Sequence, residues 1–350
     1  MTDMEPTREA PPDRRRLRTG LTVAVAIGVT VGLVVAVATG GTTVISAASK
    51  LPLPWLGLAL ALSGLSWVFQ GFGLAVLSRR GARGHLLGMT AAFLSGDFAA
   101  LVSPFGSGSI PVTVFSLTRE GLSAGESSAI VAMHTLLTGV SFLVLGIGAA
   151  LVLPMRDAAS RALVWSAVGV ISLALAFVVL IAVRPHWAVR RIDGALGRPW
   201  LATLLGPERA LRVTDGVQRE AHLFADAVVT LTREKPWRLV ASFAGVFASR
   251  ACLVVCLPVI MYGLGWRGPL LPMLATGVGA MALSAVSPTP GGSGAVEGGA
   301  AVLLVTQAPP AIAGAATLLW RGVTYYAELL VGWIVFTRYL AKRPKPPVIS

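Results

Sequence analysis

Charged side chains are scarce in this sequence of 350 residues: Asp, Glu, Lys and Arg together make up only 13% of it. Apolar residues make up 55%, and the mean hydropathy is +0.75. A soluble domain carries about 25% charged residues, so this composition excludes an ordinary soluble enzyme or binding domain. Several apolar runs reach about 20 residues, the length with which a helix crosses the hydrocarbon core of a bilayer. We therefore expect an all-α polytopic membrane protein.

Cysteine is almost absent, and the motifs of common catalytic and nucleotide-binding sites are missing. Cys252 and Cys256 stand four residues apart in one apolar run, so no disulfide framework is implied and both are expected to be small packing residues. The four histidines do not cluster with them in the manner of metal ligands. Neither a GxxxxGK[ST] phosphate loop nor an HExxH zinc motif occurs. We expect no metal, no cofactor and no ATP-driven step, and we expect a protein that is not an enzyme.

Acidic residues are outnumbered, with 16 Asp and Glu against 29 Lys and Arg, which gives a net charge of +13. In a soluble protein such a charge would suggest a nucleic-acid partner. In a membrane protein, the preference of Lys and Arg for cytoplasmic loops explains it, so we expect the lipid bilayer as partner and no nucleic acid. The first apolar run begins near Leu21 and is too long for the core of a cleavable signal peptide, so it is predicted to be a membrane helix.

The apolar runs divide the chain into two membrane halves, 21–183 and 237–341. A basic tail over 1–20 and a short tail over 342–350 flank them, and an Arg-rich amphipathic segment over 184–236 lies between them, where it is expected to rest on the inner leaflet. Two apolar segments, 89–117 and 270–306, are each interrupted by Gly, Pro and Ser. Continuous runs, each predicted to be one membrane span, cover 21–45, 54–77, 129–153, 163–183, 238–264 and 310–340.

The distribution of Lys and Arg orients these segments. If both interrupted segments are re-entrant hairpins, six spans remain, both termini are cytoplasmic, and the segments assigned to the cytoplasm hold most of the 29 basic residues. This arrangement predicts a multi-pass protein of the inner (plasma) membrane. Ten full crossings would give the same sidedness, so charge does not separate the two alternatives. The stretch 89–102 has only about 14 residues, short of a full span.

The two interruptions resemble each other and enter from opposite sides in this arrangement. The first runs from Ser103 to Gly108 as SPFGSG, and the second runs from Ser287 to Gly294 as SPTPGGSG. Each follows one long apolar helix and precedes another. This pattern is typical of an inverted repeat, an architecture common among transporters. The alternative is a chance similarity between two Gly- and Pro-rich breaks.

A backbone break at membrane depth requires a reason, because unpaired N–H and C=O groups in hydrocarbon each cost several kcal/mol. Such a break persists where it is buried in protein or lines a wet cavity. Proline ends the preceding helix, and glycine lets the chain turn and lets a ligand approach. A helix restarting near Ala295, or near Pro111 in the first break, would present its N-terminus to an anion. The candidate binding residues are Pro104, Gly106, Gly108, Pro288, Pro290, Gly291, Gly292 and Gly294.

Five charged residues fall within apolar stretches, where an ionisable group costs at least about 2.5–3.5 kcal/mol and suggests function. They are Asp97, Arg250, Glu297, Arg321 and Glu328. Arg250, Glu297 and Arg321 are the predicted headgroup-binding charges, with Glu297 paired to either arginine. Glu328 follows Arg321 by seven residues and would share its helical face. The alternative for these charged residues is an ion pair that only fixes helix packing. For the uncharged His134, a packing or hydrogen-bonding role is expected.

The second break resembles the signature of a known family. The run Pro288-Thr289-Pro290-Gly291-Gly292-x-Gly294-x-x-Glu297 is similar to a motif of the flippase-like family, also called the lysylphosphatidylglycerol synthase transmembrane region family. The first break and Thr118–Ser123 are similar to its first-half motif, and the resemblance covers about residues 20–340. It implies a protein that moves lipids between leaflets. Because the chain stops at Ser350, we expect a standalone member without the synthase domain.

The sequence departs from this family at positions where relatives often carry charged residues: Ile110, Thr113, Met133 and His134. If those charges handle the headgroup, the substrate differs here or transport is lost. The hypothesis is a lipid flippase-like protein that binds and translocates an anionic or aminoacylated phospholipid, or a polyprenyl-linked lipid. The alternatives are a non-transporting membrane partner of a cell-envelope lipid or glycan enzyme, and an intramembrane lipid transferase that uses Glu297 as a base.

Overall fold

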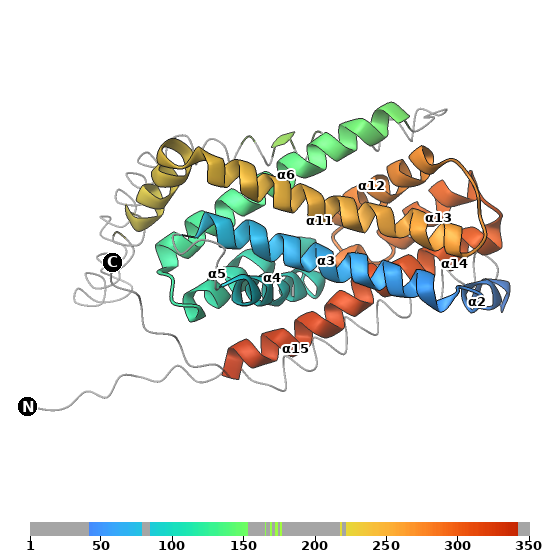
Figure 1. Ribbon diagram of the computed structural model, residues 1–350, viewed down its shortest axis with the longest axis horizontal. Coiled ribbons are helices and arrows are strands. Elements are labelled where there is room, and N and C mark those ends of the chain that lie inside the picture. Colours follow the sequence, from blue (N-terminus) through green and yellow to red (C-terminus); the bar gives the residue numbers. More distant parts are fainter. Residues whose placement is uncertain are drawn as a thin grey trace, which may run out of the picture.

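The computed structural model describes residues 42–78, 85–152 and 222–341, together with a few isolated helical positions between 165 and 218. This described part is helical and contains no strand, which confirms the predicted all-α class (Figure 1). The predicted span over 163–183, most of the span over 21–45, both tails and most of the segment over 184–236 lie outside the described residues.

Within the described residues, three helices are long and apolar enough to cross a membrane: α3 (Leu53–Leu77), α6 (Ala124–Val152) and α11 (Pro236–Gly263). They lie close to the runs predicted over 54–77, 129–153 and 238–264. α3 and α11 each begin with proline in the first turn, where its missing N–H has no helical partner to lose. The two helices pack along much of their length in opposite directions (Figure 1). Gly245 permits this approach, since a Cβ there would lie 3.1 Å from the Phe69 carbonyl oxygen.

Both interrupted segments form a helix, a short 3₁₀ turn and a second helix. The first consists of α4 (Leu86–Leu101), η1 (Pro104–Gly106) and α5 (Ser109–Arg119). The second consists of α12 (Leu270–Val286), η3 (Pro290–Gly292) and α13 (Ala295–Val305). In each the two helices pack against each other, so each segment is a hairpin.

The predicted restart of the helix at Ala295 is confirmed. The helix predicted to start near Pro111 is α5, which begins at Ser109 and holds Pro111 in its first turn, where proline is tolerated. The 16 residues of α4 extend about 24 Å at 1.5 Å per residue, less than the roughly 30 Å hydrocarbon core.

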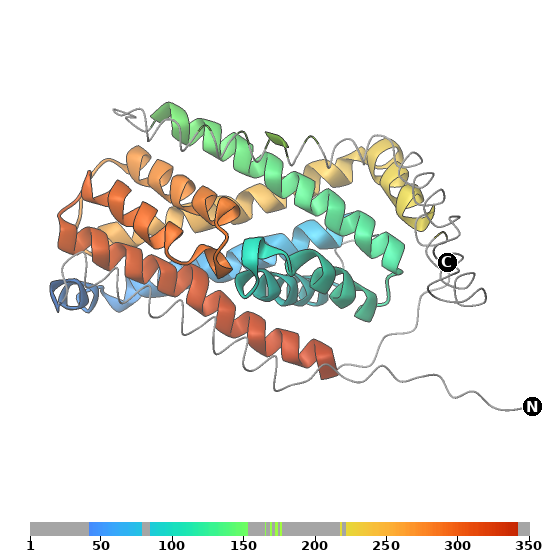
Figure 2. The same cartoon turned by 180° about the vertical axis from the view of Figure 1, so that it is seen from behind.

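The two hairpins enter the bundle from opposite ends and meet in the middle. The first follows the end of α3 and the second follows the end of α11, and these two ends lie at opposite extremes of the molecule (Figures 1 and 2). The η1 and η3 turns contact each other. One apolar core, centred on Leu257, Met273 and Trp320, lies on the side of the second hairpin, and another, centred on Leu74 and Ile130, lies on the side of the first.

The last apolar run, predicted as one span over 310–340, is continuous but contains a π-helical turn. It consists of α14 (Pro310–Arg321), η4 (Gly322–Tyr326) and α15 (Ala327–Ala341). A π turn widens the helix and leaves a carbonyl without its usual partner. The Val323 carbonyl accepts a hydrogen bond from Ser63 Oγ of α3 at 3.0 Å. This turn lies directly after Arg321, next to the cavity described below.

Two shorter elements complete the described part. α2 (Thr42–Ala48) packs on α14, and the π turn η2 (Thr230–Glu234) leads into α11. Residues 222–229 are helical. They are the end of the segment expected on the leaflet surface, yet Val228 and Leu231 are buried in the core beside α4 and α6.

Candidate functional site

The two hairpin tips contain the same 3₁₀ turn and diverge after it, with φ −73° at Gly108 and 91° at Gly294. In each, a proline opens the turn and the next two residues have positive φ: 53° and 66° at Phe105 and Gly106, 60° and 69° at Gly291 and Gly292. Ser107 N–H donates to the Pro104 carbonyl and Ser293 N–H to the Pro290 carbonyl, both at 3.1 Å. Positive φ favours glycine, so Phe105 is a strained position for a bulky residue.

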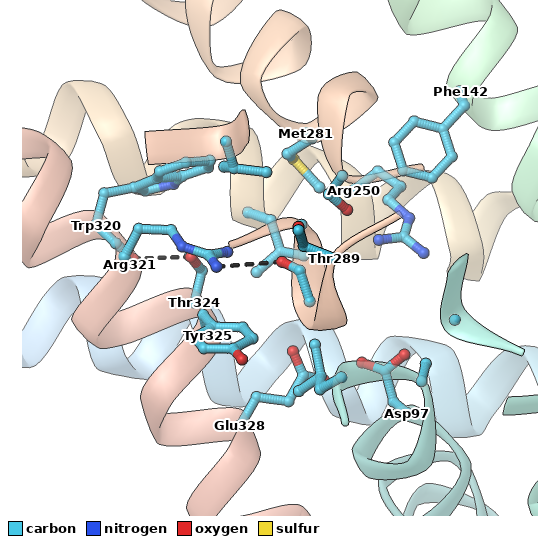
Figure 3. A pocket seen from close by; sticks show the side chains of 18 of the residues that line it. Asp97, Phe142, Arg250, Met281, Thr289, Trp320, Arg321, Thr324, Tyr325 and Glu328 are labelled. Atoms are coloured by element: carbon cyan, nitrogen blue, oxygen red, sulfur yellow. Dashed lines mark hydrogen bonds between the residues drawn. The ribbon is translucent and has the colours of Figure 1, made fainter. Parts of the chain in front are cut away.

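A cavity of about 250 Å³ lies where the tips meet (Figure 3). Phe105 and Gly106 line it from the first hairpin, and Thr289, Gly291 and Gly292 line it from the second. Four charged residues line it from helices: Asp97 of α4, Arg250 of α11, Arg321 of α14 and Glu328 of α15. Apolar walls come mainly from Phe142, Met281 and Trp320. The fold therefore gathers four of the five intramembrane charges at one place.

Glu297 is the fifth charge, and it lies behind the cavity as the partner of Arg321. It is the third residue of α13, and its Oε2 accepts the Gly294 N–H at 2.8 Å in a capping interaction. Its Oε1 accepts Arg321 Nε at 2.8 Å. The N-terminus of α13 is therefore already served by a carboxylate of its own chain, so Gly294 N–H does not offer the free donor expected for a ligand.

Two of the three guanidinium nitrogens of Arg321, Nε and Nη2, donate hydrogen bonds to the second hairpin. Besides Glu297, its guanidinium donates to the Gly291 carbonyl at 3.1 Å and stacks over the Tyr325 ring, 4.0 Å from the centroid. Arg321 and Glu297 are 6% and 2% exposed, so the pair is buried and well hydrogen-bonded. These contacts tie the hairpin tip to α14 and settle which arginine pairs with Glu297.

Arg250, unlike Arg321, makes no hydrogen bond to a described residue. Its guanidinium stacks over the Phe142 ring at 4.7 Å, and its Nε is buried without a hydrogen-bond partner among the described residues. Asp97 and Glu328 are close enough to act on it electrostatically, and they interact with each other. In Figure 3, Arg250 and Arg321 lie on opposite sides of Thr289. Arg250 is thus a cavity cation whose hydrogen-bonding capacity is not used within the described part of the protein.

A family model described as the lysylphosphatidylglycerol synthase TM region matches residues 21–332. The chain belongs to this family. The resemblance predicted from the second break is thereby confirmed. Family membership and the three long apolar helices identify an integral membrane protein of the flippase-like kind. None of the curated proteins compared with the chain matches it.

Of the predicted proline and glycine site residues, some line the cavity and others lie only in the turns beside it. Pro104, Gly108, Pro288, Pro290 and Gly294 belong to the two breaks but are not among the residues that line the cavity. They shape the turns that bring Gly106, Gly291 and Gly292 to it.

The four departures from the family pattern also lie away from the cavity lining. Ile110 is exposed on α5, and Thr113 Oγ1 donates to the Ser109 carbonyl at 2.8 Å. Met133 is buried in an apolar core, and His134 is 7% exposed. These four positions therefore do not contribute to the lining of the cavity.

Sequence reasoning missed the aromatic and hydroxyl side chains of the site. Phe142, Thr289, Trp320, Thr324 and Tyr325 all line the cavity. A usable signal was present for two of them, since Thr324 and Tyr325 follow Arg321 by three and four residues and so share one helix face with it. No signal in the sequence pointed to Phe142, because only the packing of α6 on α11 brings it to Arg250.

A substitution at Gly291 tests the tip geometry directly. A Cβ there would overlap the Tyr325 ring, and the φ of 60° disfavours any other residue. Gly291→Ala should lower the free energy of unfolding by about 1–3 kcal/mol, measured by denaturation in detergent micelles. Gly298→Ala in α13 is the matched control, because its Cβ meets nothing within 4 Å. Equal stability of the two variants would contradict the tip geometry.

Proposed function

We propose that this protein binds and translocates an anionic lipid between the two leaflets of the membrane. The candidate substrates are an anionic or aminoacylated phospholipid and a polyprenyl-linked lipid. The observation that carries the proposal is Arg250, a cavity cation without a hydrogen bond to any described residue, at the meeting point of two hairpin tips. A phosphate group supplies the bidentate acceptor that a guanidinium fits.

The size of the cavity supports a site for the headgroup rather than for the whole lipid. Its volume of about 250 Å³ lies below the roughly 300–1,000 Å³ of pockets that enclose drug-sized ligands. The acyl or prenyl chains would stay in the surrounding bilayer while the headgroup occupies the cavity. Phe105, 68% exposed at the tip of the first hairpin, and Phe142 and Trp320 would line the boundary between the two.

The two hairpins support an inverted repeat and an alternating-access mechanism. In this proposal six spans cross the inner membrane, both termini are cytoplasmic, and each hairpin opens the cavity to one leaflet. The matching 3₁₀ turns and the entry from opposite ends favour it, because transporter sites commonly lie where such repeats meet. Movement would occur at the contact between η1 and η3.

The inverted repeat predicts that two loops lie on opposite sides of the membrane. Two exposed positions suit cysteine substitution: Arg267, in the loop after α11, and Ala124, at the start of α6. In a background lacking Cys252 and Cys256, a membrane-impermeant thiol reagent should label the first from outside intact cells and the second only after permeabilisation. Labelling of both from the same side would exclude the opposed orientation.

A leaflet assay tests the proposed function. The purified protein is reconstituted into liposomes that contain fluorescent phosphatidylglycerol, lysyl-phosphatidylglycerol, phosphatidylcholine or a polyprenyl phosphate. Bleaching of the outer leaflet then reports movement of each lipid. Faster movement of at least one anionic or aminoacylated lipid than of phosphatidylcholine is expected. No movement of any lipid, in protein that remains folded, would favour a non-transporting partner of a cell-envelope enzyme.

The third alternative, an intramembrane transferase with Glu297 as its base, finds less support. Both carboxylate oxygens of Glu297 accept hydrogen bonds, one from Gly294 and one from Arg321, and the residue does not line the cavity. A general base needs an oxygen within hydrogen-bond reach of the substrate proton. A covalently altered lipid recovered from the leaflet assay would be required to revive this alternative.

A further inference from the structure

Phe105, at the tip of the first hairpin, has a backbone conformation that suits glycine and not phenylalanine. Its φ and ψ are 53° and 19°, and among the described residues it is the one non-glycine residue with positive φ. Gly291 holds the equivalent position of the second tip, with φ 60° and ψ 16°. A bulky side chain in this region is a strained outlier, and such strain is typical of ligand clamps and switch regions.

The packing of the Phe105 ring does not explain this strain. The side chain is 68% exposed, and none of the apolar cores in the described part of the chain contains it. At Gly291 the Tyr325 ring fills the space that a Cβ would need, so the second tip requires glycine for a second reason. The ring of Phe105 instead lines the cavity, together with Ala100 and Leu101 of α4.

Phe105 lies at the rim of the cavity. Trp320 and Tyr325 also line it but are 2% and 1% exposed, so they form its inner wall. The exposed Phe105 ring instead borders both the cavity and the surroundings of the protein. The two tips meet midway along the bundle, and at that depth a membrane protein is surrounded by hydrocarbon (Figure 2). The ring is therefore an apolar group between the bilayer and a charged cavity.

The two tips are held unequally. The second tip is tied to α14, because Arg321 donates to the Gly291 carbonyl at 3.1 Å and is itself bonded to Glu297. Residues 103–108 of the first tip form hydrogen bonds only within their own hairpin, such as Gly108 N–H to Ser103 Oγ at 2.8 Å. The η1 turn also contains no buried residue. The first tip can therefore move with the loss of fewer contacts, and a move that returns Phe105 to negative φ would release its strain.

We propose that Phe105 is the gate residue of the cavity: its ring closes the rim, and the first tip carries the ring aside when an anionic group enters toward Arg250. Control of access by the ring stands on the geometry of the tip. Its role in selecting lipids rests on the proposed function. An anionic headgroup gains the contact with Arg250, which offsets the cost of displacing the ring. A headgroup without net charge gains less from the same entry.

Access is measured without lipid transport by the reactivity of a cysteine at Val296, which lines the cavity but is 1% exposed. In a background lacking Cys252 and Cys256, a sulfonate-bearing methanethiosulfonate reagent should modify Val296→Cys slowly in detergent micelles. Phe105→Ala should speed this modification several-fold, and Phe105→Leu should retain most of the protection. No increase with Phe105→Ala would overturn the gate.

The matched control is Ile110→Ala. Ile110 is another exposed apolar side chain of the first hairpin, at 55% exposure on α5, but it does not line the cavity. Its substitution should leave the rate at Val296→Cys unchanged. An equal increase with Ile110→Ala would show a general loosening of the hairpin and would overturn the specific role of Phe105.

Phe105→Gly and Phe105→Ala separate the ring from the strain. Both remove the ring, so both should speed the modification of Val296→Cys. Only glycine adopts positive φ without strain, so Phe105→Gly should unfold at a higher temperature than Phe105→Ala. A cooperative unfolding transition in both variants would show that the faster modification does not come from unfolding. Equal midpoints would overturn the strained geometry on which the gate rests.

The lipid half is tested in the leaflet assay. Phe105→Ala should speed the movement of phosphatidylcholine more than that of the anionic lipids, so the ratio of anionic-lipid to phosphatidylcholine rates should fall several-fold. An unchanged ratio would overturn lipid selection by Phe105 but leave the proposed function intact. Absence of any lipid movement in the wild type would overturn the proposed function and lipid selection together, while the cysteine measurement would still decide the control of access.

Discussion

Glu297→Leu should lower the free energy of unfolding by about 3–5 kcal/mol, the cost of leaving one partner of a buried ion pair without the other. Arg321 would remain 6% exposed and would lose its 2.8 Å bond from Nε. The Gly294 N–H at the start of α13 would lose its acceptor as well. Leucine nearly conserves the side-chain volume, so the loss reflects charge and hydrogen bonds rather than a cavity. Denaturation in detergent micelles measures it.

A double-mutant cycle supplies the control. Arg321→Leu alone should also destabilise, whereas Glu297→Leu combined with Arg321→Leu should recover much of the loss, because no uncompensated charge remains. Strictly additive losses would show that the pair does not couple. This result would contradict the 2.8 Å contact between the two side chains.

Arg250→Gln should have the opposite profile: a large loss of function with little loss of stability. Hydrogen bonds to a charged group contribute about 1.5–3 kcal/mol, so the affinity for an anionic lipid should fall about 10- to 150-fold. Translocation in the leaflet assay should fall with it. Stability should stay unchanged or rise, because the buried Nε that the substitution removes has no hydrogen-bond partner among the described residues. Such an opposition is typical of residues kept for function.

Two variants make this prediction specific. Arg250→Lys should retain part of the activity, since it keeps the charge but loses the planar fork. Arg233→Gln, at an exposed position near the start of α11, should leave both translocation and stability unchanged. Full translocation by Arg250→Gln would remove the observation on which the proposed function rests.

The sequence predicted the described helices well because their signals are local. A span requires about 20 apolar residues, and α3, α6 and α11 end within a few residues of their runs. The breaks were visible because proline cannot continue a helix and glycine adopts positive φ. The positions at which each hairpin turns followed directly from these residues. The second helix of the first hairpin, α5, begins two residues before Pro111.

The site was predictable only in part, because helical spacing says which residues share a face but not which face of another helix they meet. Arg250, Arg321 and Glu297 were recognised as charges at membrane depth, yet the pairing of Glu297 with Arg321 is decided by the packing of α13 on α14. The packing of α6 on α11 stacks Arg250 on Phe142, and Arg250 has no ion-pair partner among the described residues. Asp97 and Glu328 reach the cavity from helices that are more than 200 residues apart in the chain.

By itself the sequence determined the membrane class, the family, the two breaks and the identity of the intramembrane charges. These properties depend on composition and on neighbours within a few residues along the chain. The tertiary structure decided which arginine is neutralised by an ion pair and which is left for a ligand. Which charges pair depends on distances between helices. In a low-dielectric interior, the electrostatic energy of a charge is set mainly by the groups that packing brings within a few ångströms of it.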